Sequence, residues 1–344
     1  MITGAAGFIG SRLAEVLSSE GIEVFGVDNL NSYYSPEYKK LRLERAGFDL
    51  SRLEEGRLLK STLFPHYKFV WMEVMEHAFS QLLGEVVPDA IVHLAAQPGV
   101  RYSVKNAREC MEMNVTLFMR ILEICKYYDI KNLFYASSSS VYGNAGEVHS
   151  QESDPAVHPM SVYAVSKRTN EMLAEVYCNM YGMRAAGLRF FSVYGEWGRP
   201  DMAPMIFADS ILNDRNIELY NSGRHYRDFT YIEDVVRSIQ AVIKGRLNEE
   251  NVEERHLLLN IGRGVKVSTS EILRLLEETL GKKGKVCNFP LQPGDPGAIL
   301  SDSKRLREMF GYSPQTDVET GMKAFAEWAA ANPRVLRIAM GRKL

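Results

Sequence analysis

The sequence predicts an α/β protein with a doubly wound parallel sheet, followed by a smaller α+β lobe toward the C-terminus. Three observations predict this fold class. Short apolar runs typical of buried strands alternate with helical patterns through residues 1–190. A glycine-rich turn joins the first strand to the first helix. After Phe191, glycine, proline and aromatic residues become dense up to Tyr231, and helical patterns then return.

The first unit is built around Gly4, Gly7 and Gly10. Apolar residues at helical spacing follow these glycines, and residues 21–27 then form a short apolar run that ends at Asp28. A strand, glycine turn, helix and second strand ending in an acid form the dinucleotide-binding βαβ unit. The glycines let backbone amides approach a pyrophosphate at the helix N-terminus. Asp28 is placed to bind both adenosine ribose hydroxyls, which favours NAD over NADP.

The first strand is short in this sequence. Only Met1 and Ile2 precede the glycine turn, whereas a typical strand has about five or six residues. We expect this strand to be the central one of the sheet, so its shortening should be costly. A misassigned start codon and a truncated chain would each account for it.

The remaining elements follow in chain order. Buried strands are predicted at residues 67–71, 89–95, 131–136 and 185–190, with helices at 115–128 and 163–181. Later, a strand is predicted at 217–220 and helices at 232–244, 269–280 and 318–331. Residues 29–66 are highly charged and longer than an ordinary connection, so we expect a partly helical surface excursion without a chemical role.

This pattern divides the chain into two parts. Residues 1–190 are predicted to form an NAD-binding Rossmann domain, which residues 234–256 also join. Residues 191–233 and 257–344 are predicted to form a second lobe that binds the substrate.

Composition disfavours several classes of protein. The net charge is −2 and no block of basic residues stands out, so nucleic-acid or membrane-surface binding is not expected. The cysteines at 110, 125, 178 and 287 lack paired spacing, which argues against a metal site or a disulfide framework and agrees with a reducing cytoplasm. No apolar run reaches the ~20 residues of a membrane span, and no signal peptide precedes the glycine turn. We therefore expect a cytoplasmic protein.

A Tyr163/Lys167 pair lies behind the serine run at 137–140. Four residues make about one helical turn, so both side chains leave the same face of a helix. A free phenol titrates near pH ~10, and an adjacent ammonium group lowers that pKa. The pair therefore suits a general base that removes a proton from an alcohol. The spacing alone is common, and a surface pair is the alternative.

Together these motifs resemble the extended short-chain dehydrogenase/reductase superfamily of NAD-dependent epimerases. Residues 3–10, 93–96, 138–143, 163–167 and 227–229 carry the resemblance. The glycine spacing, one residue wider than G-x-G-x-x-G, is the form of this superfamily. Within it, segments 28–34, 96–103, 190–202 and 292–295 resemble UDP-glucuronate 4-epimerases.

The resemblance implies roles for the residues already singled out. Tyr163 would be the base, Lys167 its electrostatic partner and nicotinamide ribose ligand, and Ser138 the hydroxyl on the reacting oxygen. Ser139 and Ser140 compete with Ser138 for that role. The residues implied to bind NAD are Gly4, Gly7, Phe8, Ile9, Gly10, Asp28, Asn29, Glu73, Val74, Leu94, Ala95, Ala96, Asn114, Tyr163 and Lys167. Glu73 replaces the usual aspartate, and Asn114 could equally be a structural contact that bends its helix.

On the substrate side, the resemblance implies that Arg227 binds the diphosphate, with a salt bridge to Asp228 or Glu233 as the alternative. Ser192 and Arg199 would bind a sugar carboxylate, whereas Arg199 could otherwise be an exposed arginine beside Trp197. The full set implied to contact the nucleotide sugar is Ser138, Ser139, Ser140, Ser192, Arg199, Met205, Phe207, Arg227, Gln292 and Asp295.

The implied reaction is NAD-dependent 4-epimerisation of a UDP-sugar, above all UDP-glucuronate to UDP-galacturonate through a transient 4-keto sugar. No acid follows Ser138, and Ser140 stands where decarboxylases carry glutamate, which disfavours dehydration and decarboxylation. The alternatives are a UDP-glucose or UDP-N-acetylglucosamine 4-epimerase, a UDP-glucuronate decarboxylase, and an NAD-sensing regulator. The resemblance also implies a homodimer formed through helices at 104–127 and 163–181, and a role in polysaccharide biosynthesis.

Overall fold

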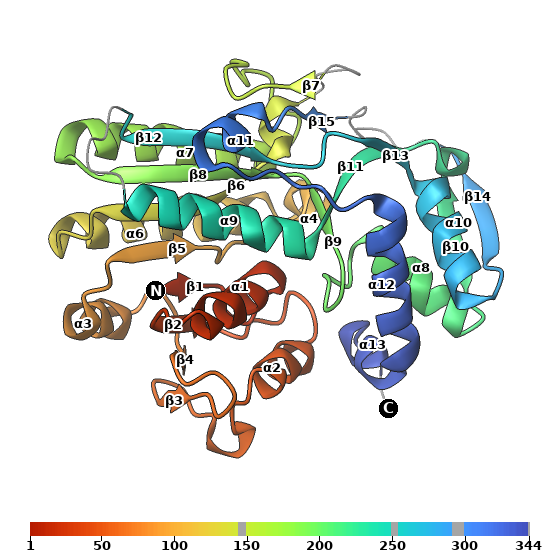
Figure 1. The fold of residues 1–344 in the computed structure, drawn as a ribbon, viewed down its shortest axis with the longest axis horizontal. Coiled ribbons are helices and arrows are strands. Elements are labelled where there is room, and N and C mark those ends of the chain that lie inside the picture. The colour runs from red at the N-terminus through yellow and green to blue at the C-terminus, as the bar shows by residue number, and fades with distance from the viewer. Residues whose placement is uncertain (144–148, 249–253, 291–298, 343–344) are drawn as a thin grey trace.

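An eight-stranded sheet forms the centre of the larger part of the molecule (Figure 1). The computed structural model describes residues 1–143, 149–248, 254–290 and 299–342. The strand order is β12-β8-β6-β5-β1-β2-β4-β3, and every pair is parallel except β3 with β4. The strands are β1 (Ile2–Thr3), β2 (Val24–Asp28), β3 (Leu58–Lys60), β4 (Tyr67–Trp71), β5 (Ala90–His93), β6 (Asn132–Ser138), β8 (Arg184–Phe190) and β12 (His256–Ile261).

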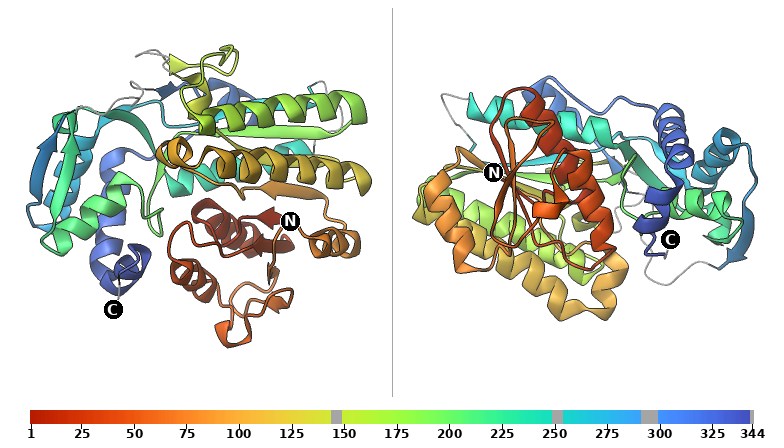
Figure 2. Two further views of the ribbon diagram at one scale, coloured as in Figure 1. Left: turned by 180° about the vertical axis from the view of Figure 1, so that it is seen from behind. Right: turned by 90° about the horizontal axis from the view of Figure 1, so that it is seen from below.

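Helices cover both faces of this sheet, as Figures 1 and 2 show. One face carries α1 (Phe8–Ser19), α9 (Ile232–Leu247) and α11 (Lys304–Phe310), and the other carries α3 (His77–Val86), α6 (Leu117–Tyr127) and α7 (Val162–Tyr181). A separate buried apolar cluster fills the space on each face. The predicted doubly wound Rossmann sheet is confirmed. Among the described residues, none of the helices has the length and apolar character needed to cross a membrane.

The first strand occupies the predicted central position although it is only two residues long. Ile2 pairs with Gly26 of β2 on one side and with Val92 of β5 on the other. Both strand residues are buried, so the glycine turn that follows starts from the middle of the sheet. A ligand at this turn therefore lies at the point where the strand order reverses.

The second lobe has its own small sheets and its own apolar cluster. Its strands are β9 (Ser192–Tyr194), β11 (Tyr226–Tyr231) and β13 (Lys266–Ser268) in one sheet, and β10 (Asn216–Tyr220) and β14 (Lys285–Phe289) in another. Its helices are α8 (Ala203–Leu212), α10 (Thr269–Leu280), α12 (Val318–Ala331) and α13 (Pro333–Ala339). A further short sheet pairs β7 (His149–Ser150) with β15 (Leu300–Ser301).

The predicted boundary after residue 256 needs adjustment. Strand β12 begins at His256 and pairs with β8 through Ile261, so the boundary would cut this strand from its sheet. Helix α9 enters the larger part earlier, at Ile232, and packs with α1. The division into two domains itself remains a prediction. Its last boundary moves from residue 256 to the end of β12 at Ile261.

The excursion after β2 is not the superficial segment that its charge pattern predicts. Helix α2 (Pro36–Arg45) buries Tyr38, Lys39 and Arg42. The guanidinium of Arg42 donates to the carbonyl of Ala6 at 3.0 Å and to the carbonyl of Trp197 at 2.7 Å. A charged side chain is buried in this way only when hydrogen bonds replace its water. The excursion therefore connects the glycine turn to the second lobe.

Candidate active site

A cavity of about 1120 Å³ lies between the carboxyl ends of the central strands and the second lobe. Its lining begins where β1, β2, β5 and β6 end, which is where ligands bind in open α/β sheets. Pockets for one small molecule usually enclose about 300–1,000 Å³. The volume is large enough for a dinucleotide beside a second ligand.

The glycine turn forms one wall of the cavity and has no room for larger residues. A Cβ on Gly4 would lie 2.7 Å from the amide nitrogen of Ala95, and one on Gly10 would lie 2.2 Å from the carbonyl oxygen of Gly4. Gly4 also has a φ of +73°, which favours glycine. Helix α1 begins directly after Gly7 and has no side-chain cap. Its first amides can therefore bind an anion, as a pyrophosphate site requires.

Asp28 lies at the end of β2, as predicted, but it is not alone. Its Oδ1 accepts from the amide of Leu30 at 2.8 Å and lies 3.5 Å from the ammonium of Lys39. Both side chains line the cavity. An isolated carboxylate would repel the 2′-phosphate of NADP, and the neighbouring ammonium of Lys39 weakens this repulsion. Lys39 was not predicted at the site, because Lys39 and Lys40 have the sequence pattern of an exposed pair of charges.

Helix α7 positions the tyrosine and the lysine. The Oγ of Ser161 accepts from the amide of Ala164 at 3.0 Å and caps the helix, which ends in the left-handed residue Gly182. Tyr163 and Lys167 line the cavity one turn apart, with the ammonium 5.9 Å from the centre of the phenol ring. The ammonium donates to the carbonyl of Ala136 at 2.9 Å.

The protonation properties of this pair differ from the expectation. Burial raises the pKa of Tyr163, while the charge of Arg199 and a hydrogen bond with Ser138 act in the opposite direction. Burial lowers the pKa of Lys167 to about 8. The ammonium of Lys167 donates to the carbonyl of Ala136, and burial outweighs the interactions that favour the phenolate. The cation that opposes burial at Tyr163 is Arg199.

Among the serines, the geometry favours Ser138 as the partner of Tyr163. Its Oγ accepts from the amide of Ser140 at 3.2 Å and from the hydroxyl of Ser140 at 2.9 Å. These contacts leave the Ser138 proton available to donate. Ser139 and Ser140 also line the cavity, whereas the buried Ser137 donates to Glu171 at 2.6 Å and is structural.

Behind the site, a buried ion pair joins α7 to β8. Glu171 lies one turn beyond Lys167, and its carboxylate binds the guanidinium of Arg189 at 2.8 and 2.9 Å. The same carboxylate accepts from Ser137, the neighbour of Ser138. Arg189 also donates to the hydroxyl of Tyr142 at 2.8 Å. This network fixes the helix bearing Tyr163 relative to the strand bearing Ser138.

Most of the other predicted site residues line the same cavity. They are Phe8, Ile9, Asn29, Glu73, Val74, Leu94, Ala95, Ala96, Ser192, Arg199, Phe207 and Arg227. Glu73 accepts from the side chain of Asn29 at 2.8 Å, which connects the ends of β4 and β2. The predicted residues Gln292 and Asp295 lie outside the described residues.

Two predicted residues do not reach the cavity. Met205 is buried in the apolar cluster of the second lobe, because α8 turns this side chain toward its own core. Asn114 lies in a π-helical turn, where its amide binds the backbone of Gln97 and donates to Ser166 at 3.0 Å. The contacts of Asn114 are therefore those of the structural alternative, in which it bends its helix and does not bind NAD.

The two arginines predicted to bind substrate are held differently. Arg227 donates to the carbonyl of Tyr226 at 2.7 Å, while Asp228 accepts from Ser301 and Glu233 pairs with Arg12. Arg199 forms an ion pair with Asp201, whose other contact is the hydroxyl of Tyr33. The arginine that stacks on Trp197 is Arg45, not Arg199.

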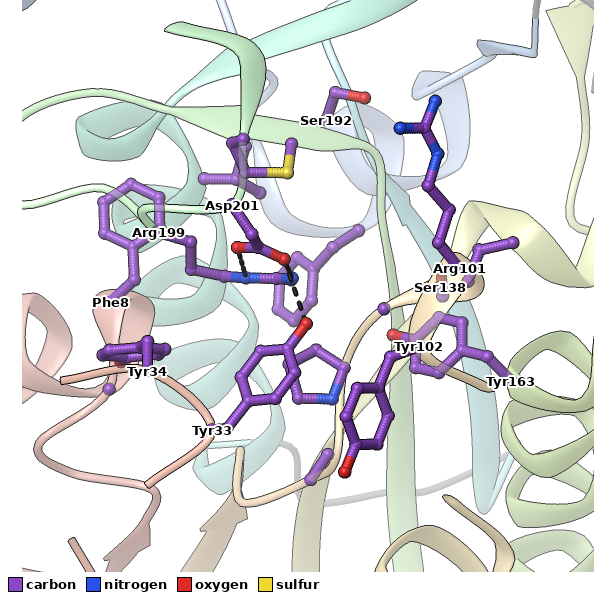
Figure 3. Close-up of a pocket in the computed structure, with 18 of the residues that line it drawn as sticks. Phe8, Tyr33, Tyr34, Arg101, Tyr102, Ser138, Tyr163, Ser192, Arg199 and Asp201 are labelled. Atoms are coloured by element: carbon purple, nitrogen blue, oxygen red, sulfur yellow. Dashed lines mark hydrogen bonds and ion pairs between the residues drawn. The ribbon is translucent and has the colours of Figure 1, made fainter. Parts of the chain in front are cut away.

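Further polar residues line the cavity without having been predicted from the sequence. They include Tyr33, Lys39, Arg101, Arg215, His225 and Arg342. Tyr33 and Arg101 fall within segments 28–34 and 96–103, which carried the resemblance, and that signal could have identified them. Figure 3 shows Tyr33, Arg199 and Asp201 together, with Ser138 and Tyr163 elsewhere on the wall.

Comparison with known proteins places the chain in a family. A model of the NAD dependent epimerase/dehydratase family matches residues 1–262, and the chain belongs to this family. A probable UDP-glucuronate 4-epimerase of Rhizobium meliloti is 35% identical over 347 residues, covering 97% of each chain. UDP-glucuronate 4-epimerase 4 of Arabidopsis thaliana is 36% identical, over 95% of this chain and 74% of its own length.

Solved structures give the same picture. UDP-glucuronic acid 4-epimerase from Bacillus cereus, in complex with UDP-glucuronic acid and NAD, superposes with a TM-score of 0.83. It is 28% identical, and the match covers 96% of this chain and 98% of that one. UDP-glucose 4-epimerase from Thermotoga maritima, with UDP-glucose, gives a TM-score of 0.82 at 25% identity and covers the same shares.

Proposed function

We propose that this protein is an NAD-dependent 4-epimerase of UDP-sugars, an isomerase that interconverts UDP-glucuronate and UDP-galacturonate. The observation that carries the proposal is the meeting of Tyr163, Ser138 and the glycine turn in one cavity. A base, a hydroxyl donor and a dinucleotide cradle are the parts needed to oxidise an alcohol reversibly. The UDP-glucuronate 4-epimerases among its relatives support the choice of sugar.

The residues present fit NAD. The turn at Gly4 and Gly10 leaves a space that a Cβ would fill, and the uncapped start of α1 suits the pyrophosphate. Asp28 and Lys39 would hold the adenosine ribose, and Lys167 the nicotinamide ribose. When bound, NAD would supply reversible hydride transfer at C4 of the sugar.

The residues of the chain would supply proton transfer and orientation. Tyr163 takes the proton of the sugar 4-hydroxyl, and Ser138 donates a hydrogen bond to that oxygen as it becomes a carbonyl. The keto sugar then turns to present its other face, and Tyr163 returns the proton. Arg199 stabilises the phenolate form of Tyr163 through its charge. The substrate undergoes no net oxidation.

The substrate side combines cations for the diphosphate with a polar site for the sugar. Arg227 would bind the phosphates, because a guanidinium fork suits their oxygens. Ser192 and Arg199 would bind the carboxylate, which favours the acidic sugar over glucose. Neutral-sugar 4-epimerisation is the alternative, since a UDP-glucose 4-epimerase shares the fold at 25% identity.

The test is proton NMR of purified protein incubated with UDP-glucuronate, UDP-glucose or UDP-N-acetylglucosamine, without added reductant. The proposal expects UDP-galacturonate to appear from the first and little product from the others. Turnover of a neutral sugar alone would refute the choice of substrate. Formation of a UDP-pentose with CO₂ would indicate a decarboxylase, and NAD binding without turnover of any sugar would indicate a regulator.

Homodimer formation and a cytoplasmic location belong to the same proposal. Along one side of α7, Val165, Met172, Val176 and Met180 are exposed, and Met180 is 65% exposed. An apolar stripe of this kind is typical of a helix that packs on a partner. The described cysteines are free thiols, which agrees with a reducing compartment. Light scattering should give twice the chain mass, and Val176→Asp should give the monomer mass.

A further inference from the structure

The guanidinium that is proposed to bind the sugar carboxylate already holds a carboxylate of the chain itself. The Nε of Arg199 donates to Oδ1 of Asp201 at 3.1 Å, and its Nη2 donates to Oδ2. The hydroxyl of Tyr33 donates to the same Oδ2 at 3.1 Å (Figure 3). All three side chains line the cavity.

The geometry of this contact determines how a ligand carboxylate can bind Arg199. A guanidinium offers the Nε–Nη2 edge as a fork for two carboxylate oxygens, and Asp201 occupies this edge of Arg199. Another carboxylate can bind the same edge only by displacing Asp201. A sugar with a neutral 6-hydroxyl does not need to displace Asp201 and leaves the ion pair intact.

Exposure indicates that this displacement is feasible. The side chain of Asp201 is 38% exposed and that of Arg199 is 26% exposed, so Asp201 can turn toward water. By contrast, the two side chains of the Glu171–Arg189 pair are at most 1% exposed and have no such freedom. Partly exposed ion pairs contribute little to stability, so one of them can be exchanged at small cost.

We propose that Asp201 is a tethered carboxylate that competes with the substrate carboxylate for Arg199, and that Tyr33 strengthens its hold. Asp201 thereby lowers the preference of the site for acidic over neutral UDP-sugars. This inference rests on the proposed function, in which Arg199 faces the sugar. Tyr33 comes from the excursion after β2 and Asp201 from the loop after β9, so residues of both parts of the chain set this preference.

Calorimetric titration of a Tyr163→Phe holoenzyme, which binds sugars without turning them over, tests this competition. The dissociation constants of UDP-glucuronate and UDP-glucose are measured with and without Asp201→Asn. Asparagine keeps the size of the side chain and still accepts from Tyr33, but it lacks the charge. The ratio of affinities should shift toward UDP-glucuronate by about fivefold. Tyr33→Phe should shift it the same way by about twofold.

Asp129→Asn is the matched control. Asp129 forms an exposed pair with Lys131 and does not line the cavity, so the ratio should stay unchanged. The content of bound NAD and the thermal unfolding midpoint establish that each variant is folded. If Asp201→Asn does not fold, the affinity ratio of Tyr33→Phe tests the proposal instead.

An unchanged ratio, or a shift toward UDP-glucose, would overturn the role of Asp201. It would mean that Asp201 orients Arg199 instead of competing for it. The wild-type NMR assay is independent of this result. A wild-type enzyme that leaves UDP-glucuronate unchanged refutes the proposed function, whereas an unchanged ratio in an active enzyme refutes only the competition.

Discussion

Replacing Glu171 by glutamine should destabilise the protein strongly although the two side chains have nearly the same shape. The carboxylate of Glu171 is fully buried and binds four donors, from Ser137 at 2.6 Å, Arg189 at 2.8 and 2.9 Å, and Arg168 at 2.9 Å. Glutamine removes the charge and turns one acceptor into a donor that faces Arg189. The guanidinium of Arg189, 1% exposed, then remains buried without its counter-charge.

The expected loss is about 3–5 kcal/mol, the usual cost of removing one partner of a buried ion pair. The double variant Glu171→Leu/Arg189→Met removes both charges, so it should lose less than the sum of the two single variants. Burial alone would raise the pKa of Glu171, but the hydrogen bonds and charge of Arg189, with Ser137 and Arg168, hold it below its usual range. The carboxylate therefore stabilises the fold above its unfolded pKa of about 4.3, and this contribution is lost as the pH falls through the lower folded value.

Urea unfolding at pH 7 and in the acid range measures both effects. The wild type should lose stability on acidification more steeply than Glu171→Gln does. A single-variant loss below about 1 kcal/mol would refute the reasoning, because an exposed pair costs that little. Single losses that simply add in the double variant would also refute it.

Three further predictions concern the site. Tyr163→Phe should abolish epimerisation while NAD stays bound, and turnover above background by NMR would exclude Tyr163 as the base. The pKa of Lys167 is about 8, below the unfolded value of about 10.4. The unfolded chain therefore binds more protons between these values, so the unfolding free energy should rise with pH across this window. Lys167→Met should remove this part of the rise in urea unfolding, and an identical pH dependence in the variant would contradict the lowered pKa of Lys167. Arg42→Met should lower the free energy of unfolding in urea by about 1–3 kcal/mol and speed the loss of NAD on dilution, because the carbonyls of Ala6 and Trp197 lose their buried donor. Unchanged NAD retention would show that Arg42 does not support the glycine turn.

Local sequence patterns predicted those helices and strands whose bounds depend mainly on their own residues. Helices α10 (Thr269–Leu280) and α12 (Val318–Ala331) have the predicted bounds, and β4 (Tyr67–Trp71) does as well. Each combines an apolar period with clear flanking signals, such as Ser268 as the cap of α10. The glycine turn and the Tyr163/Lys167 pair could be recognised in the sequence for the same reason, because each is a short local motif.

Contacts between distant segments could not be predicted from local patterns. Arg42 and Lys39 look like surface charges in sequence, and only the fold brings partners to them from Ala6, Trp197 and Asp28. Burial has the same long-range origin, so the raised pKa of Tyr163 could not be derived from its spacing to Lys167. The Arg199–Asp201 pair is close in sequence, but its position in the cavity depends on how the second lobe packs.

The buried guanidinium of Arg42 also constrains how the protein moves. It holds the carbonyl of Ala6 in the glycine turn and that of Trp197, two residues before Arg199, with one rigid group. An opening motion that keeps these hydrogen bonds would pivot near α2 and would widen the cavity at the end away from the glycine turn. A nucleotide sugar would then enter and leave from that end, while the dinucleotide next to the pivot stays enclosed through successive turnovers.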